Sequence, residues 1–431
     1  MTRVPIRDVQ DVQEAVQTHP RLLSVGGGSK PALSSPLISP SGSSPDDTPV
    51  TLLDVSALRG VVEYDPGEFT FTAGAATPVA EISAMLAERN QYLPFDPPFA
   101  ARGATLGGTV ATGLAGSMQY RFGGVRDFLI GARFVDGRGQ LIRGGGKVVK
   151  NAAGFDLPRL MVGSLGRLGI LTEVTFKVFP APAATATVYA EFPSLELALE
   201  ALIRLTRSRF DLEALDLVPG SLMISEGSIS EEEPRTQEGS VPGESRTEGR
   251  PASGATLLAR IGGVADGLPA RQRQVAEFLT GGNQSGASAP PVSVSPVLVS
   301  TSGTPDHDVT HWAAMAEMNW CPEGWSLYRV PVTPARVAAL DRSWSAEGAI
   351  RRYTSGAQTA WVAWPGEESQ LNRLLRAAGL GALRVDGPPS RQPWIGTIPG
   401  GPFLERITSA LDPDNRFDLP GIWPRADVSH G

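Results

Sequence analysis

Glycine is concentrated in four short clusters within the first 170 residues of this 431-residue chain. The clusters are GGGSK at 26–30, ATLGG at 104–108, FGGVRD at 122–127 and GSLGRLGI at 163–170. Because glycine has no Cβ, its backbone can adopt a positive φ and its N–H group can approach a ligand closely. Successive N–H groups in a turn form a concavity that binds anions. The clusters therefore predict loops that hold a phosphorylated ligand.

The clusters do not fit the common nucleotide-binding motifs. The sequence has no G-x-x-x-x-G-K-[ST] loop, and neither 26–28 nor 107–111 continues with the G-x-G-x-x-G spacing. A dinucleotide held by several separated loops is the interpretation we favour, and ordinary turns are the alternative for any one cluster. Hydroxyls of Ser29 and Thr105 add polar groups, Lys30 adds charge, and a helix that begins after a loop would add its N-terminal partial charge.

Composition excludes several classes of protein. The formal net charge of −7 and the absence of a basic block argue against nucleic acid as a partner. The single cysteine, Cys321, excludes an internal disulfide framework and an iron–sulfur cluster ligated by this chain alone. No apolar run approaches the ~18 residues of a membrane-spanning helix. Residues 1–17 lack the apolar core of a secretory signal, so we expect a cytoplasmic protein.

Hydrophobic periodicity predicts mixed α and β structure. We expect strands at 22–25 and 169–178, a hairpin of 129–135 with 140–143, and helices at 195–205 and 370–378. Thr77 followed by Pro78 predicts a helix cap, with Val79, Ile82 and Leu86 on the buried face.

Two domains are expected, 1–182 and 183–431, because prolines and alanines interrupt the pattern near 180–186. Stretches at about 34–49, 227–254 and 281–304 are rich in Ser, Pro, Gly or Glu and predict surface insertions.

Several longer motifs carry a resemblance. In order they are GGGSK (26–30), DPP (96–98), ATLGG (104–108), RFGGVRDF (121–128), KNAAGFDLPRLMVGSLGRLGILTE (150–173) and DPDNRFDLPG (412–421). This order resembles the FAD-binding subunits of bacterial glycolate oxidase complexes and, more broadly, the vanillyl-alcohol-oxidase type of FAD-linked oxidases. The resemblance is dense from about 20 to 180 and returns only at the last motif.

The resemblance implies an α+β fold, in which a two-subdomain FAD-binding domain is followed by an α+β cap domain. It implies that the first loop contacts the pyrophosphate and that the second continues the phosphate site. The flavin side would be lined by the third cluster, and the fourth would present backbone groups to the cofactor. The implied cofactor-binding residues are Gly26, Gly27, Gly28, Ser29, Thr105, Leu106, Gly107, Gly108, Gly113, Gly123, Gly124, Asp127, Gly169 and Ile170.

The sequence departs from the family at positions that carry chemistry. Covalent members have His or Cys where this chain has Ser29 and Lys30, so noncovalent FAD is expected. Gly113 replaces a frequent Asn, and the H-x-H-x-G-D-G-N stretch of catalytic hydroxy-acid members is missing. The catalytic base is therefore unassigned. No metal site is expected: His307 and His311 have i, i+4 spacing but no evident third ligand, and an exposed helix start is favoured over a metal pair or a catalytic one.

For other conspicuous side chains we favour a structural role over a functional one. Cys321 is expected to be a buried, inert thiol. Tyr353, Trp361 and Trp364 predict a core strand, with a cover over the flavin as the alternative. Arg351-Arg352 is expected to be a solvated pair, with an anchor for a carboxylate or for a partner's acidic patch as the alternatives.

The function implied by the resemblance is the FAD-binding subunit of a complex that oxidises glycolate, a small 2-hydroxy acid, to glyoxylate. Implied partners are a paralogous FAD-containing catalytic subunit and an iron–sulfur subunit, through which any contact with the inner membrane face would run. Two alternatives stay open. One is an autonomous FAD-dependent dehydrogenase of another 2-hydroxy acid or alcohol, and the other is a non-catalytic scaffold.

Overall fold

Short glycine-rich loops join the strands of two small sheets in the N-terminal part of the computed structural model. The structure describes residues 2–34, 50–146, 156–220, 254–281, 293–296, 300–301, 307–388, 393–397 and 401–417. The insertions expected at 34–49, 227–254 and 281–304 lie almost entirely outside these ranges, as do the start of the motif at 150–173 and the end of the motif at 412–421.

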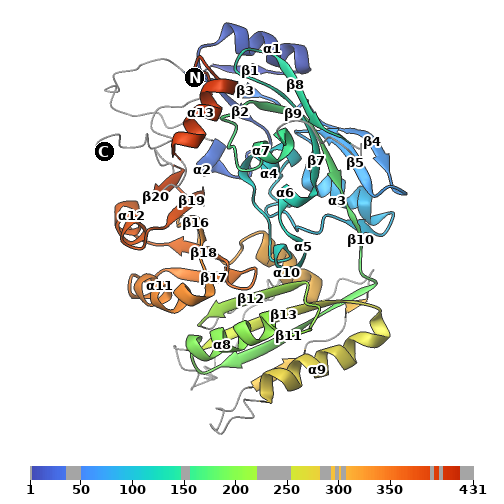
Figure 1. Cartoon of the computed structure of the whole chain (residues 1–431), viewed down its shortest axis with the longest axis vertical. Helices are drawn as coiled ribbons and strands as arrows, with labels where there is room; N and C mark the ends of the chain where they lie inside the picture. The colour runs from blue at the N-terminus through green and yellow to red at the C-terminus, as the bar shows by residue number, and fades with distance from the viewer. Residues whose placement is uncertain are drawn as a thin grey trace, which may run out of the picture.

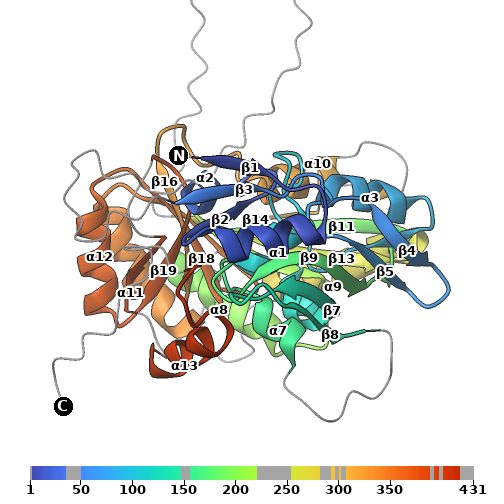
Figure 2. The same ribbon diagram turned by 90° about the horizontal axis from the view of Figure 1, so that it is seen from above.

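The first sheet is parallel and has the order β1-β3-β2. Its strands are β1 (Arg3–Pro5), β3 (Thr51–Asp54) and β2 (Leu22–Val25), and α1 (Val9–Thr18) packs against it. Helix α1 begins where the Asp8 carboxylate accepts a hydrogen bond from the N–H of Asp11 at 2.9 Å. Seen from above, α1 lies next to β2 and β3 (Figure 2). The strand predicted at 22–25 is confirmed.

The second sheet is antiparallel and has the order β4-β5-β9-β7-β8. Its strands are β4 (Val61–Asp65), β5 (Thr70–Gly74), β9 (Ile170–Lys177), β7 (Leu129–Val135) and β8 (Leu141–Gly145). A small pair, β6 (Gln91–Tyr92) with β10 (Phe179–Pro180), adjoins it. The helices of this part are α2 (Pro31–Ser34), α3 (Val79–Ala87), α4 (Leu106–Thr112), α5 (Gln119–Phe122), α6 (Val125–Phe128) and α7 (Leu157–Met161). The predicted hairpin and the strand at 169–178 are both confirmed.

The expected cap of α3 is wrong by one residue. Pro78 occupies the N-cap position and makes no side-chain cap, while Val79, Ile82 and Leu86 are buried as predicted. The Thr77 hydroxyl accepts a hydrogen bond from the N–H of Gly60 at 2.9 Å instead. A tertiary contact to the turn before β4 therefore displaces the local cap.

A ten-stranded sheet forms the second half, with the order β14-β11-β13-β12-β17-β18-β16-β19-β20 and β15 paired to β11. Its strands are β11 (Ala184–Phe192), β12 (Ala214–Pro219), β13 (Ala255–Gly263), β14 (Ser293–Pro296), β15 (Ser300–Thr301), β16 (Ser326–Pro331), β17 (Ile350–Thr354), β18 (Thr359–Trp364), β19 (Gly381–Asp386) and β20 (Trp394–Gly396). The helices are α8 (Leu195–Thr206), η1 (Ala265–Gly267), α9 (Leu268–Thr280), α10 (His307–Ala316), α11 (Pro334–Ala346) and α12 (Glu368–Ala377). The helices predicted at 195–205 and 370–378 correspond to α8 and α12. Figure 1 shows this sheet below the two N-terminal sheets.

Both faces of the large sheet are buried, against different partners. Alternate residues of β18 point to opposite faces. Trp364 packs in the cluster with α8, α9, α11 and α12, whereas Trp361 packs in the cluster of the five-stranded sheet. Tyr353, Trp361 and Trp364 are all buried, which confirms the core interpretation of this segment.

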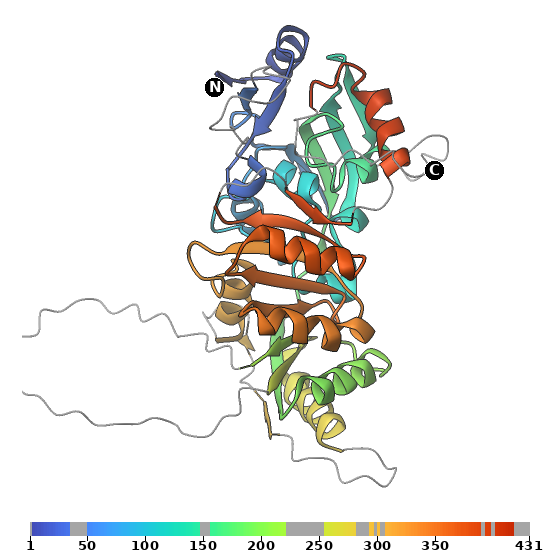
Figure 3. The same ribbon diagram turned by 90° about the vertical axis from the view of Figure 1, so that its left-hand side faces the viewer.

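The chain crosses between the two parts twice. It leaves the N-terminal sheets between Pro180 and Ala184, and it returns through α13 (Gly401–Leu411). The Leu411 carbonyl accepts a hydrogen bond from the N–H of Gly137 at 2.8 Å, and the Arg416 carbonyl accepts one from the N–H of Leu22 at 2.8 Å. Figure 3 shows α13 beside the N-terminal sheets. The boundary predicted at 182 thus stays a prediction, and the C-terminal residues lie with the first part.

Charged side chains are buried where the large sheet meets the N-terminal part. Arg352 on β17 is 2% exposed and pairs with Asp216 on β12 at 2.5 Å, and the Ser117 hydroxyl donates to the same carboxylate at 2.5 Å. Arg351 pairs with Asp341 at 2.8 Å. The expected solvated arginine pair is therefore wrong, because β17 turns each arginine toward a buried acid.

Replacing Arg352 with methionine is expected to lower the free energy of unfolding by about 3–5 kcal/mol, because it leaves Asp216 buried without its cation. Urea denaturation measures this loss. The loss should shrink at acidic pH, since burial raises the pKa of Asp216 and a protonated carboxyl needs no cation. The control is Arg342→Met at the exposed pair with Glu196, which should cost less than about 1 kcal/mol. Equal losses would contradict this account.

Candidate functional site

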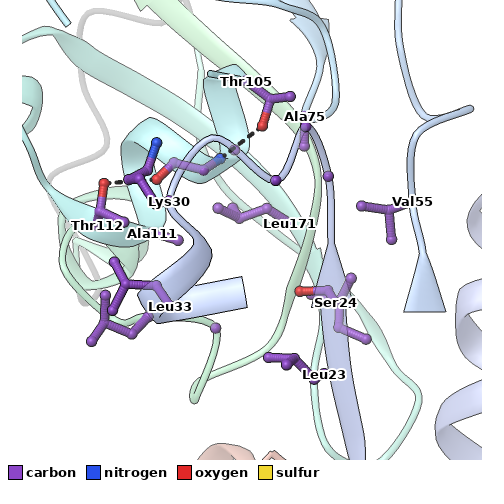
Figure 4. Close-up of a pocket in the computed structure, with 18 of the residues that line it drawn as sticks. Leu23, Ser24, Lys30, Leu33, Val55, Ala75, Thr105, Ala111, Thr112 and Leu171 are labelled. Carbon is purple, nitrogen blue, oxygen red and sulfur yellow. Dashed lines mark hydrogen bonds between the residues drawn. The ribbon is translucent and has the colours of Figure 1, made fainter. Parts of the chain in front are cut away.

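A solvent-open cleft with an empty volume of about 1270 Å³ lies among β2, the loop that follows it, the start of α4 and the segment before β9. Nine of the cofactor-binding residues predicted from the sequence line it. They are Gly26, Gly27, Gly28, Ser29, Thr105, Gly107, Gly108, Gly169 and Ile170. Figure 4 shows Lys30, Thr105 and Thr112 on one side of this pocket and Leu23 and Ser24 on the other. Three of the four glycine clusters therefore meet at one place.

The remaining predicted residues lie away from this cleft. The Leu106 side chain is buried in the core of the five-stranded sheet, and Gly113 ends α4 with a φ of 63°. Gly123 and Gly124 precede α6, where the Asp127 carboxylate accepts a hydrogen bond from the N–H of Gly124 at 2.9 Å. The third cluster thus forms a capped turn of its own.

Glycine is required where the loops touch. A Cβ on Gly27 would overlap the carbonyl oxygen of Gly103, so the first loop can rest on the second only without a side chain there. A Cβ on Gly107 would lie 2.9 Å from the carbonyl oxygen of Ala75. Gly28 has a φ of 65° and nothing within 4 Å of its missing Cβ, so it turns the chain beside open space.

The first loop keeps its backbone donors available. Among the described residues, no group accepts a hydrogen bond from the backbone N–H groups of 26–30. In the second loop, the N–H of Gly107 donates to the Ala75 carbonyl at 2.6 Å, and that of Gly108 donates to the Thr105 hydroxyl at 3.2 Å. Helices α2 and α4 have only four and seven residues, so neither contributes a large helix dipole to the cleft. The N–H groups of the first loop are therefore available to an anion in the cleft.

Two cations line the same cleft. Lys30 belongs to the first cluster, and its Nζ lies 3.1 Å from the Ser29 hydroxyl. Arg167 belongs to the fourth cluster and was not among the predicted binding residues. Its position between two glycines of GSLGRLG is the sequence feature from which a binding role could have been predicted. Phe417, from the motif at 412–421, also lines the cleft and was missed.

A second polar group surrounds a much smaller and narrow cavity between the N-terminal part and the large sheet. Asp96 of the DPP motif, Ser117 and Arg352 line it together with Trp312 and Trp361. The Asp96 carboxylate accepts a hydrogen bond from the N–H of Met118 at 2.9 Å. Burial raises the pKa of Asp96 to about 7, against the opposing effect of that hydrogen bond. Because Asp216 already pairs with Arg352, an anion here would meet a cation that is already neutralised.

The other side chains considered from the sequence lie outside the cleft. The ring of His311 makes an edge contact with Tyr189, 5.5 Å between centres, and His19 contacts the Thr51 hydroxyl at 3.4 Å. Burial raises the pKa of the half-buried Cys321 thiol to about 11, so it is protonated at neutral pH. Within the described ranges, no three His, Cys, Asp or Glu side chains gather as metal ligands do. No helix in those ranges has the length and apolar composition to cross a bilayer.

Comparison with known families decides what the first part of the chain is. Residues 4–145 match the family model described as FAD binding domain. The match covers about a third of the chain. It contains β2, the first loop, the second loop and α4, and the cofactor expected from the motifs is confirmed as FAD.

The relatives are named as oxidase subunits or dehydrogenases of hydroxy acids, which confirms the resemblance. The chain is 38% identical to "Glycolate oxidase subunit GlcE" of Escherichia coli strain K12 over 51% of this chain and 61% of that protein. It is 30% identical to "Glycolate oxidase subunit GlcD" of Bacillus subtilis strain 168, over 38% and 33%. It is also 30% identical to a D-2-hydroxyglutarate dehydrogenase of Xanthomonas citri pv. viticola, over 38% and 34%. Each match spans less than two thirds of the relative.

Solved structures extend the likeness of fold to the whole chain. A structure of alkyldihydroxyacetonephosphate synthase superposes with a TM-score of 0.65 over 97% of this chain and 75% of that one, at 14% identity. The FAD binding domain and the large sheet after it therefore follow a known arrangement, which confirms the expected fold class.

Replacing Gly27 with alanine is expected to weaken FAD binding tenfold or more, because the methyl group forces the two loops apart. A loss of about 1.4 kcal/mol is sufficient for that change. Flavin fluorescence titration measures the Kd. Gly67→Ala, in the exposed turn between β4 and β5 with its nearest contact at 3.5 Å, is the matched control and should bind as the wild type does. Wild-type affinity in Gly27→Ala would refute the role assigned to this contact.

Proposed function

We propose that this chain is the FAD-carrying subunit of a complex that oxidises glycolate to glyoxylate. The observation that carries the proposal is the first loop: five successive N–H groups without described acceptors, beside Lys30, in a domain of the FAD binding family. The similarity to a subunit named for glycolate oxidase supplies the substrate. Bound FAD would accept a hydride from a carbon bearing a hydroxyl group.

Each part of the cleft has a task in this proposal. The N–H groups of 26–29 and the cations Lys30 and Arg167 bind the diphosphate, which carries negative charge and accepts hydrogen bonds. The hydrogen bond from the N–H of Gly108 to the Thr105 hydroxyl holds the shape of the second loop. Gly169 and Ile170 face the cofactor from the start of β9. Gly113, Gly123, Gly124 and Asp127 lie outside the cleft, and in this proposal they shape the backbone toward the flavin end.

Partner subunits complete the reaction in this proposal. Oxidation of a hydroxy acid needs a base for the hydroxyl proton, and no histidine or unpaired carboxylate of the described residues lines the cleft. The chain has one cysteine, so an iron–sulfur cluster that receives the electrons would be held by another subunit. A paralogous flavoprotein similar to the subunit GlcD would carry the base.

A second candidate is an autonomous dehydrogenase of another 2-hydroxy acid. The names of the relatives that act on D-2-hydroxyglutarate and D-lactate favour it. The buried Asp96, whose pKa lies near neutrality, could accept a proton in that case. The neutralised Arg352 beside it argues against a carboxylate ligand in the same cavity.

The test is the colour of the purified full chain and its response to glycolate without oxygen. We expect one FAD per chain and a flavin that glycolate alone does not bleach. Co-production with the proteins of the neighbouring reading frames should restore bleaching. Full glycolate oxidation by the isolated chain would favour the autonomous enzyme, and a chain that never binds FAD would refute both.

A further inference from the structure

Lys30 is a buried cation with no ion-pair partner among the residues that the structure describes. Its side chain is 6% exposed, and its Nζ contacts the Ser29 hydroxyl at 3.1 Å and lies 5.7 Å from the centre of the Phe99 ring. Among the described residues, no carboxylate pairs with it. An ammonium group in such a place lacks both water and a counterion.

The charged neighbours of Lys30 make contacts of their own, although one carboxylate oxygen of Glu317 has no hydrogen-bond partner among the described residues. Arg102 lies 4.9 Å from the centre of the Phe99 ring and pairs with Asp386 at 2.6 Å. The Glu317 carboxylate accepts a hydrogen bond from the N–H of Ala101 at 2.9 Å. Arg102 disfavours the charged form of Lys30 and Glu317 favours it, so the two effects oppose each other. Arg167 lines the same cleft and adds a further positive charge there.

Burial lowers the pKa of Lys30 from its ordinary value of 10.5 to about 8, and the charge of Arg102 adds to this effect. A diphosphate in the cleft would reverse the shift, since a nearby negative charge favours the ammonium form. The position of Lys30 is consistent with a contact to the diphosphate. It follows directly on the loop whose N–H groups are available, and it lies beside Gly108 of the second loop.

We propose that Lys30 makes cofactor binding proton-linked: FAD binds to the protein with Lys30 charged, because the diphosphate supplies the negative charge that this buried ammonium group otherwise lacks. This inference rests on the proposed binding of the diphosphate at the first loop. Lys30 is a binding residue in it and takes no part in substrate oxidation.

The sign of the effect follows from linkage. Below the pKa of the free protein, Lys30 is protonated with and without FAD, so the affinity does not depend on this group. Above it, FAD binding must take up a proton, and the Kd rises by up to about tenfold per pH unit until the pKa of the complex is reached. The cofactor is therefore retained at neutral pH and lost more easily in alkaline solution.

The experiment is a titration of the full-length apoprotein with FAD, followed by flavin fluorescence, from about pH 6.5 to about pH 9.5. We expect a constant Kd up to near pH 8 and a steep rise beyond it. Lys30→Met should bind more weakly at neutral pH and lose the rise, while Lys30→Arg keeps its charge throughout and should also show none. Lys177→Met removes an exposed lysine of β9 and should keep the wild-type profile.

Calorimetry supplies a second measurement that needs no variant. Titrations in two buffers of different protonation enthalpy count the protons taken up with FAD, and we expect about half a proton near pH 8 and nearly one a pH unit higher. A flat wild-type profile with no proton uptake, or a slope that survives in Lys30→Met, would overturn the proposal while FAD binding stands. A protein that binds no FAD at any pH would overturn the proposed function as well.

Discussion

The contact of two main chains, between Gly27 and the carbonyl of Gly103, is the constraint on which the rest of the site depends. In the second loop, the N–H groups of Gly107 and Gly108 donate to Ala75 and Thr105, whereas no described group accepts a hydrogen bond from the N–H groups of the first loop. The first loop follows β2 of the parallel three-stranded sheet, and the second lies between β6 and the start of α4. A chain with side chains at these positions could form both sheets and still lack the anion site.

The inner face of the large sheet packs against the FAD binding domain. Period-two alternation sends Trp364 to the helix layer and Trp361 to the N-terminal core. On the same inner face, Arg352 and Asp216 neutralise each other between the two halves. Both groups lose water on burial, so a buried pair of this kind adds little net stability. Its main effect is to specify how the two halves meet.

Local patterns were readable from the sequence, and long-range pairings were not. The strand at 22–25, the hairpin joined by 136–139 and the convergence of three glycine clusters follow from turn chemistry and periodicity. The Arg351-Arg352 interpretation was wrong because the partner of Arg352 is 136 residues away along the chain. Thr77 was misread as a cap because its hydroxyl bonds to Gly60. The roles of single binding residues, Gly113 and Asp127 included, stay predictions.

The return of the chain after α13 bears on how the protein matures. Phe417 forms part of the wall of the cleft, and the carbonyl of Arg416 accepts a hydrogen bond from the N–H of Leu22 at the start of β2. The Asp412 carboxylate in turn accepts hydrogen bonds from the N–H groups of Arg416 and Phe417 and shapes this turn. The wall of the cleft therefore contains residues that the ribosome adds late together with residues that it adds early. An N-terminal fragment released during synthesis would present an unfinished binding surface, so coenzyme loading belongs after translation has passed this point.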